Sequence, residues 1–139
     1  MPFVRDDTHW LFKLSPDEWI RSAMGELRRA EDAYKQKNAR AGLAGARRAA
    51  GMALNAVLIL TPNEAWGRSY MDHLLAVKRD GAEGAPPRIR EAAAILVDTP
   101  LPGGDLVAIR TASADERVLE AARDVLAHAY AMVKRSGEA

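Results

Sequence analysis

Residues 38–77 decide the fold of this chain, and they read NARAGLAGARRAAGMALNAVLILTPNEAWGRSYMDHLLAV. Small side chains recur at helical spacing in the first half of this stretch, at Gly42, Gly45, Ala49, Ala53 and Ala56. Residues three or four apart share one helix face, so this stripe of small residues lets a second helix approach closely. The opposite flank is predicted to be an exposed basic face, and it holds Arg40, Arg47, Arg48 and Asn55. The stretch therefore predicts a tightly packed antiparallel helical bundle.

The composition indicates one all-α domain. The chain has 139 residues, which is a common size for a single domain. Hydrophobic residues make up 48% of it but aromatic residues only 6%, so the core must consist mainly of Ala, Leu, Val, Ile and Met. These residues favour or tolerate helix. We expect an antiparallel up-and-down bundle of four to five helices.

Charge and cysteine content exclude some functions without assigning one. Lys and Arg total 20 against 19 Asp and Glu, so any basic patch that binds nucleic acid must be local. The absence of cysteine excludes disulfides and thiol catalysis. The N-terminus lacks the apolar segment of a signal peptide, and the longest apolar run, around 53–60, is too short to span a bilayer. We expect a cytoplasmic protein that does not associate with membranes.

Capping patterns place the helices along the chain. Ser15 and Glu18 form a capping box around Pro16, which opens a helix that ends near Asn38. The second helix is expected at 39–60, a short turn opened by Thr61-x-x-Glu64 follows, and Ser69-x-x-Asp72 opens a third helix to about residue 78. A fourth helix is expected at 88–97 and a last one from Ser113 to about residue 134, after a long segment rich in Pro and Gly. The predicted organisation is an N-terminal arm at 1–14, the bundle at 15–135 and a frayed tail at 136–139.

The order and spacing of several motifs resemble those of the HEPN domain, named for a nucleotide-binding domain of higher eukaryotes and prokaryotes. The motifs are Trp19 with AEDAY at 30–34, RRAAGMAL at 47–54 and AWGRSYMDHLL at 65–75. The resemblance implies a compact helical bundle that forms a homodimer, and many such domains are encoded beside a small nucleotidyltransferase. The chain departs from the branch with this Trp-Gly turn at Arg68, where His is frequent, and at residues 102–105, where PGGD replaces Arg-Tyr-Pro-Asp.

The predicted last helix contains a second motif, which reads RDVLAHAY from Arg123 to Tyr130. It resembles the signature of ribonuclease toxins in the same family, with Arg123, Asp124 and His128 at the catalytic positions. The resemblance implies metal-independent RNA cleavage across a dimer cleft, with Tyr130 as the hydroxyl that a nucleotidyltransferase partner modifies with AMP. The chemistry suits these residues, because Arg can hold a phosphate through two hydrogen bonds and His can transfer a proton near neutral pH.

Two alternatives remain open for these candidate residues. Arg123 and His128 lie about 140° apart on a straight helix, so they converge only if a partner or a bend brings one cleft to both. The chain would otherwise be a non-catalytic helical module for dimerisation or ligand binding. The basic residues Arg40, Arg47 and Arg48 are candidates for binding phosphates of RNA or of a nucleotide, or they form a solvated face paired with carboxylates on the first helix.

The sequence offers little support for a metal or cofactor. Three His, no Cys and no paired Glu-x-x-His argue against zinc and di-iron sites, and the usual glycine-rich phosphate loops are missing. His73 is predicted to be a packing residue because Tyr70 and Val77 lie one turn away on either side. We therefore expect no metal and no cofactor, and an RNA or nucleotide ligand as the leading possibility.

Overall fold

The computed structural model describes residues 10–82, 84–100 and 112–137, whose regular secondary structure is entirely helical, without a strand. The five α-helices in this part of the chain are α1 (Pro16–Lys35), α2 (Ala39–Leu60), α3 (Tyr70–Asp80), α4 (Pro87–Asp98) and α5 (Ala112–Ser136). Two short 3₁₀ helices, η1 (Trp10–Lys13) and η2 (Glu64–Trp66), precede α1 and α3. The predicted all-α bundle is confirmed, and the segment at 101–111 lies outside the described residues.

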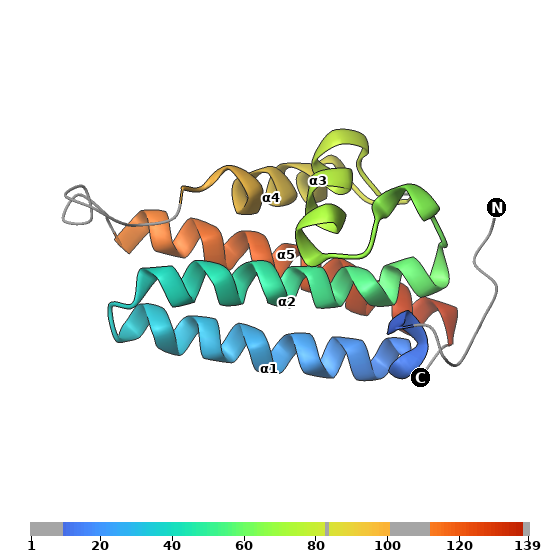
Figure 1. Ribbon diagram of the computed structural model, residues 1–139, viewed down its shortest axis with the longest axis horizontal. Helices are drawn as coiled ribbons and strands as arrows, with labels where there is room; N and C mark the ends of the chain where they lie inside the picture. Colours follow the sequence, from blue (N-terminus) through green and yellow to red (C-terminus); the bar gives the residue numbers. More distant parts are fainter. Residues whose placement is uncertain (1–9, 83, 101–111, 138–139) are drawn as a thin grey trace.

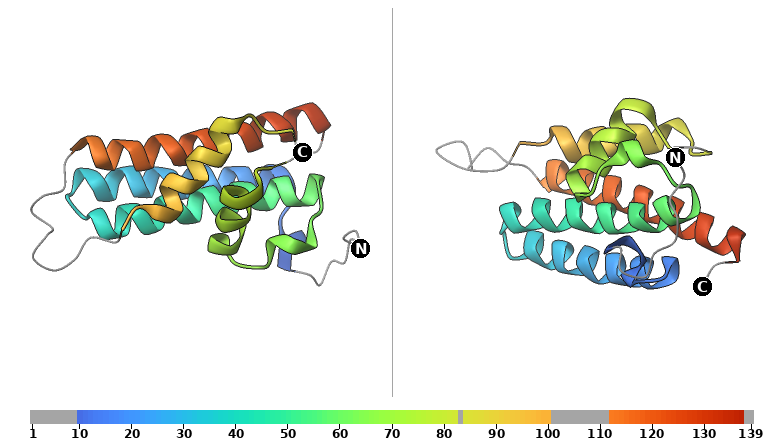
Figure 2. Two further views of the ribbon diagram at one scale, coloured as in Figure 1. Left: turned by 90° about the horizontal axis from the view of Figure 1, so that it is seen from above. Right: turned by 45° about the vertical axis from the view of Figure 1, so that its right-hand side comes forward.

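The long helices lie side by side and the short ones cover them (Figure 1). α1 and α2 are antiparallel neighbours, α5 runs beside both of them, and α4 runs antiparallel to α5. Seen from above, α4 crosses obliquely between α2 and α5, while α3 packs on α2 and α4 (Figure 2, left). α2 is therefore the central helix, in contact with all four others.

Local contacts define both ends of α1 and the start of α2. Ser15 Oγ accepts a hydrogen bond from Glu18 N at 3.2 Å, and Glu18 Oε1 accepts one from Ser15 N at 2.9 Å, which confirms the capping box. At the other end of α1, Lys37 adopts a positive φ of 61° and reverses the chain. Asn38 caps the start of α2, since its Oδ1 accepts from Ala41 N at 3.2 Å.

The turn between α2 and α3 differs in one detail from its prediction. Ser69 and Asp72 form the expected capping box, with bonds of 3.0 and 3.3 Å. Thr61 does not cap η2, because its hydroxyl donates back to Val57 O at 3.0 Å and thereby extends the end of α2. Asn63 caps η2 instead, accepting from Ala65 N at 3.0 Å.

The small residues of α2 permit the close contact that the sequence predicted. A Cβ added to Gly45 would lie 3.1 Å from the Cβ of Ala30 in α1, and one added to Gly42 would lie 2.6 Å from the ring of Tyr34. Real Cβ atoms rarely approach a neighbour so closely. The α1–α2 contact therefore depends on glycine at these positions.

The predicted exposed basic face on the opposite flank is only partly correct. Asn55 is fully buried, and a Cβ on Gly51 would lie 2.3 Å from the Cβ of Tyr70 at the start of α3. Because α3 packs on this flank, the second half of α2 has no exposed face there. The arginines lie in the first half of the helix.

α2 is also the most apolar helix. Its 22 residues include an 18-residue window of mean hydropathy 1.3, long and apolar enough by these criteria to cross a membrane. The prediction that no apolar segment is long enough rested on residues 53–60 alone and is wrong by this measure. Within the bundle 67% of the window is buried, so the central position of α2 accounts for its composition.

Part of the predicted N-terminal arm packs against the bundle. Leu11 of η1 is fully buried, and its carbonyl accepts a hydrogen bond from the indole of Trp19 at 2.9 Å. Trp19 lies in the first turn of α1, so this bond joins η1 to the helix that follows.

Candidate functional site

Arg123 faces α1 and is held by three carboxylates. Its guanidinium contacts Glu31 of α1 at 2.7 Å, Glu116 at 2.7 Å and Glu120 at 3.5 Å. The hydrogen bonds that Arg123 donates to Glu31 and then to Glu116 hold the pKa of Arg123 above its ordinary value. In this arrangement Arg123 links α1 to α5 across 92 residues of sequence.

His128 faces the opposite flank of α5. The residue is 8% exposed, and its Nε2 is buried without a hydrogen-bond partner in the described part of the chain. Burial, followed by the charges of Arg135 and Arg88, lowers the pKa of His128 below its ordinary 6.5. The imidazole is therefore neutral at neutral pH.

Within one chain, Arg123 and Asp124 line two different hollows, and His128 lines neither of them. Arg123 lines a hollow between α1 and α5, together with Glu31, Tyr34 and Leu119. Asp124 lines a groove between α4 and α5 instead. Arg123 and His128 thus stay on opposite flanks, as the helical spacing indicated, and the bundle does not bend to bring them together.

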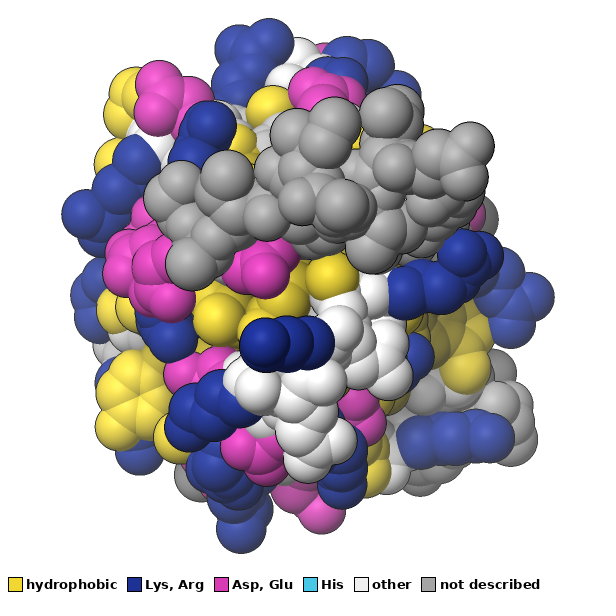
Figure 3. Space-filling model, turned by 90° about the vertical axis from the view of Figure 1, so that its left-hand side faces the viewer, with side chains coloured by type: hydrophobic (Ala, Val, Ile, Leu, Met, Phe, Trp, Pro, Cys, Tyr) yellow, Lys and Arg dark blue, Asp and Glu magenta, His cyan; other side chains and the backbone are white. Residues whose placement is uncertain are grey.

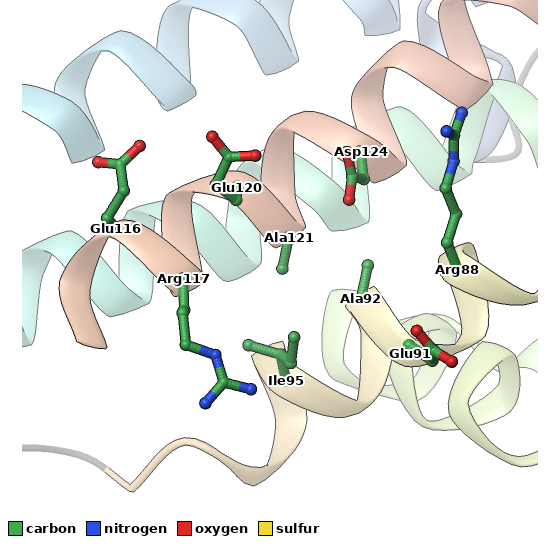
Figure 4. A pocket seen from close by; sticks show the side chains of 9 residues that line it. All are labelled: Arg88, Glu91, Ala92, Ile95, Glu116, Arg117, Glu120, Ala121 and Asp124. Carbon is green, nitrogen blue, oxygen red and sulfur yellow. The ribbon is translucent and has the colours of Figure 1, made fainter. Parts of the chain in front are cut away.

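The groove between α4 and α5 has a volume of about 360 Å³ (Figure 4). Ala92, Ile95 and Ala121 form an apolar floor between the two helices. Charged side chains surround it, namely Arg88, Glu91, Glu116, Arg117, Glu120 and Asp124. Only Asp124 was among the residues that the sequence suggested. The others occupy facing positions on two helices whose pairing no local motif reveals.

Arg47 and Arg48, two of the three candidate phosphate-binding residues, contact other helices of the bundle. Arg47 donates to the carbonyl oxygens of Leu96 at 2.7 Å, Val97 at 3.2 Å and Thr99 at 2.9 Å, at the end of α4. Arg48 pairs with Glu26 at 2.9 Å, and Arg40 is exposed near the start of α2. A phosphate would therefore have to displace carbonyl or carboxylate partners from Arg47 and Arg48.

The surface at the α1–α2 turn mixes both signs of charge. Dark blue Lys and Arg side chains alternate with magenta Asp and Glu side chains over this end of the bundle (Figure 3). A surface that follows a nucleic acid backbone typically gathers basic side chains on one face. The described part of this end has no such single-sign patch.

Tyr130 is accessible on α5. Its side chain is 46% exposed, and Lys134 Nζ lies 5.3 Å from the ring centroid. Tyr130 therefore lies at the surface of α5.

His73 packs inside the bundle, as predicted. It is fully buried, stacks on Trp10 at 6.0 Å between ring centroids, and lies 5.8 Å from the ring of Trp66. Its Nε2–H donates to Gly67 O, with Nε2 at 3.1 Å, and burial lowers its pKa below the ordinary 6.5. The Trp-Gly turn is therefore a packing motif that joins η2 to α3. Among the described residues, no group of three His, Asp or Glu side chains is arranged to hold a metal ion.

The whole bundle is similar to a solved HEPN domain. The crystal structure of a HEPN domain protein from Thermotoga maritima matches with a TM-score of 0.64 and 20% sequence identity, covering 84% of this chain and 98% of that one. No family model and no curated protein matches the sequence. The architecture is that of a HEPN domain, which confirms at the level of fold the resemblance seen in the motifs.

Proposed function

We propose that this protein is a HEPN-like domain that binds a nucleotide or RNA in the groove between α4 and α5 and acts as a homodimer without catalysis of its own. The observation that carries the proposal is the groove itself, which combines an apolar floor with Arg88 and Arg117 at its rim. Its volume of about 360 Å³ lies within the range of small-molecule sites.

The groove chemistry suits a nucleotide. A base can lie on the methyl and methylene groups of the floor, and guanidinium groups can hold its phosphate. The acidic rim residues Glu91 and Glu120 can accept hydrogen bonds from the ribose hydroxyls or the exocyclic amino group of a base.

Titration with adenosine 5′-monophosphate (AMP) and with a short single-stranded RNA, followed by NMR amide shifts, tests the proposal. We expect shifts centred on Ala92, Ile95 and Ala121. Arg117→Glu should weaken binding, whereas Arg28→Glu, an exposed residue of α1, serves as the matched control. Absence of shifts at the groove with both ligands at millimolar concentration would refute it.

A metal-independent ribonuclease is the second candidate, favoured by the unpartnered, neutral imidazole of His128. A neutral imidazole can accept a proton from an attacking ribose hydroxyl. Arg123 would have to exchange its carboxylate partners for the scissile phosphate, with Asp124 nearby on α5. Cleavage should survive EDTA and fall on the order of a hundredfold in Arg123→Ala and in His128→Ala. Intact RNA with the wild-type protein would remove this candidate.

A nucleotidyltransferase partner belongs to the same second candidate. The exposed hydroxyl of Tyr130 is the proposed AMP acceptor. Co-expression with such an enzyme, followed by intact-mass measurement, should show one added AMP in the wild type and none in Tyr130→Phe. An adduct that persists in Tyr130→Phe would place the modification elsewhere.

A further inference from the structure

Two arginines from different helices flank His128. Arg88 belongs to the first turn of α4, and Arg135 follows His128 by two turns on α5. Because α4 and α5 are antiparallel, the start of α4 lies beside the second half of α5. Figure 4 shows Arg88 and Asp124 on facing helices at the same end of the groove, and Asp124 precedes His128 by one turn. Both guanidinium charges are close enough to act on the imidazole.

These arginines differ from most others in the bundle. Arg47, Arg48, Arg90 and Arg123 each have carbonyl or carboxylate partners. In the described residues, by contrast, Arg88 and Arg135 have no ion pair or hydrogen bond from their side chains. Two guanidinium groups without an ion pair or hydrogen bond can bind an anion from solvent, and the imidazole of His128, whose Nε2 is buried without a partner among the described residues, lies within range of both charges.

The backbone adds to the positive potential. Pro86 at the N-cap of α4 makes no side-chain capping bond, so the positive end of this 12-residue helix is not neutralised by a cap. His128 is the second and independent feature here, since it is 8% exposed, its Nε2 has no partner among the described residues, and it belongs to the half of α5 that packs beside the start of α4. The organic part of a ligand held at Arg88 could extend into the groove, because Arg88 lines that groove as well.

We propose that Arg88, Arg135 and the first turn of α4 bind a phosphate monoester dianion, and that His128 takes up one proton from solvent when it binds. The identity of the organic part rests on the proposed nucleotide function, whereas the phosphate site does not. No bond is made or broken in this step. The proton comes from water or buffer and is released again when the ligand dissociates.

The charges around His128 explain the coupling. Arg135 of α5 and Arg88 of α4 act on the imidazole, and the carboxylates of Glu91 and Asp124 line the groove between these two helices together with Arg88. The arginines of α2 lie in its first half, and α1 packs on the Arg123 flank, so neither helix brings a charge to this side. A dianion offsets both guanidinium charges, which favours the imidazolium. The carboxylates of Asp124 and Glu91 carry one negative charge each, so they bind Arg88 and Arg135 less strongly than a phosphate dianion does.

Imidazole NMR of His128 tests the proposal directly. Its pKa is measured without ligand, with inorganic phosphate and with AMP. We expect both ligands to raise the pKa of His128 and to leave that of His73, enclosed by Trp10 and Trp66, unchanged. Arg88→Gln and Arg135→Gln should each weaken phosphate binding by about tenfold or more. Arg28→Gln is the matched control, and all three residues are exposed, so the variants should retain the helical circular dichroism of the wild type.

The outcomes separate this site from the proposed function. Groove shifts with AMP but an unchanged pKa of His128 would overturn the phosphate site and leave the groove function standing. A raised pKa with inorganic phosphate, lost in Arg88→Gln, would support the site even if AMP leaves the groove floor unperturbed, and the nucleotide function would then be wrong. Equal weakening in Arg28→Gln would reduce the effect to general surface charge and overturn the proposal.

Discussion

The free space around the Cα of a helical glycine decides whether the glycine can be replaced by a larger residue. Gly51 has no room for a Cβ, because the start of α3 lies against it, with the Cβ of Tyr70 at 2.3 Å from the added atom. Gly25 in α1 has ample room, since its added Cβ would meet only the flexible end of Arg29 at 3.8 Å. Both glycines lie in helices, but replacing them with alanine should change the stability of the protein in opposite directions.

We predict that Gly51→Ala lowers the free energy of unfolding by about 1–3 kcal/mol, because the added methyl forces α3 away from α2. Gly25→Ala should instead raise it by about 0.5–1 kcal/mol, since alanine loses less conformational freedom in a helix interior. Urea unfolding of the two variants beside the wild type measures both. A stabilised Gly51→Ala would show that α3 does not pack on α2 as described.

At the scale of the helix, two arginines donate hydrogen bonds to the carbonyl groups at the C-terminal ends of other helices. The last carbonyl groups of a helix lack backbone partners. Arg47 of α2 supplies donors to three of them at the end of α4, and Arg90 of α4 donates to Lys78 O at 2.9 Å and Arg79 O at 2.7 Å in the last turn of α3. Cations at these positions also complement the negative end of the helix dipole.

Arg47→Met should therefore destabilise the protein by about 1–3 kcal/mol, since it removes charged hydrogen bonds from partly buried carbonyl groups. Arg48→Met is the matched control. Arg48 is adjacent, 46% exposed and paired with Glu26 on the surface, so its loss should stay within about 1 kcal/mol. Hydrogen exchange should accelerate most at the end of α4 in Arg47→Met. Equal losses in both variants would contradict a specific role for Arg47.

These elements also show how far the sequence could be interpreted. Ser15 and Ser69 could be assigned as caps because their partners lie three residues away. The carbonyl partners of Arg47 lie 49 to 52 residues away, so its role depends on how α2 and α4 cross. The small residues at Gly45 and Ala49 predicted close packing correctly, but Asn55 could not be recognised as buried without knowing that α3 covers its flank.

The same distinction holds for the candidate site. The position of Arg123 and His128 on one helix, and the angle between them, followed from their spacing. The carboxylates around Arg123 and the arginines around His128 come partly from α1 and α4, so they follow only from tertiary packing. The groove floor is formed by two helices for the same reason.

At the scale of the whole molecule, two buried imidazoles make stability depend on pH. Burial lowers the pKa of both His73 and His128 below 6.5. As the pH falls below about 6.5, the unfolded chain binds protons before the folded one does, so stability is complete above this pH and declines below it.

We predict a fall in the free energy of unfolding between pH 7 and 5, with a slope of at most about 1.4 kcal/mol per pH unit for each histidine. Urea unfolding at several pH values measures it. The double variant His73→Gln and His128→Gln should show a flatter profile over this range. The capping carboxylates Glu18 and Asp72, whose pKa values are lowered by their bonds to Ser15 and Ser69, contribute only at more acidic pH. A profile equally steep in the double variant would assign the dependence to other groups.

Assembly decides whether Arg123 and His128 can ever act on one phosphate. They lie on opposite flanks of α5, so a shared active site requires Arg123 from one subunit and His128 from another. A symmetric dimer would contain two such sites.

If the wild type cleaves RNA, mixing inactive Arg123→Ala with inactive His128→Ala subunits should restore activity. Half of the dimers would then be mixed, and each would contain one intact site of two, giving about a quarter of the wild-type rate. A mixture that stays inactive, although light scattering and subunit exchange show mixed dimers, would exclude a site shared between subunits. Arg123 would then be left as the link between α1 and α5 that its carboxylate partners define.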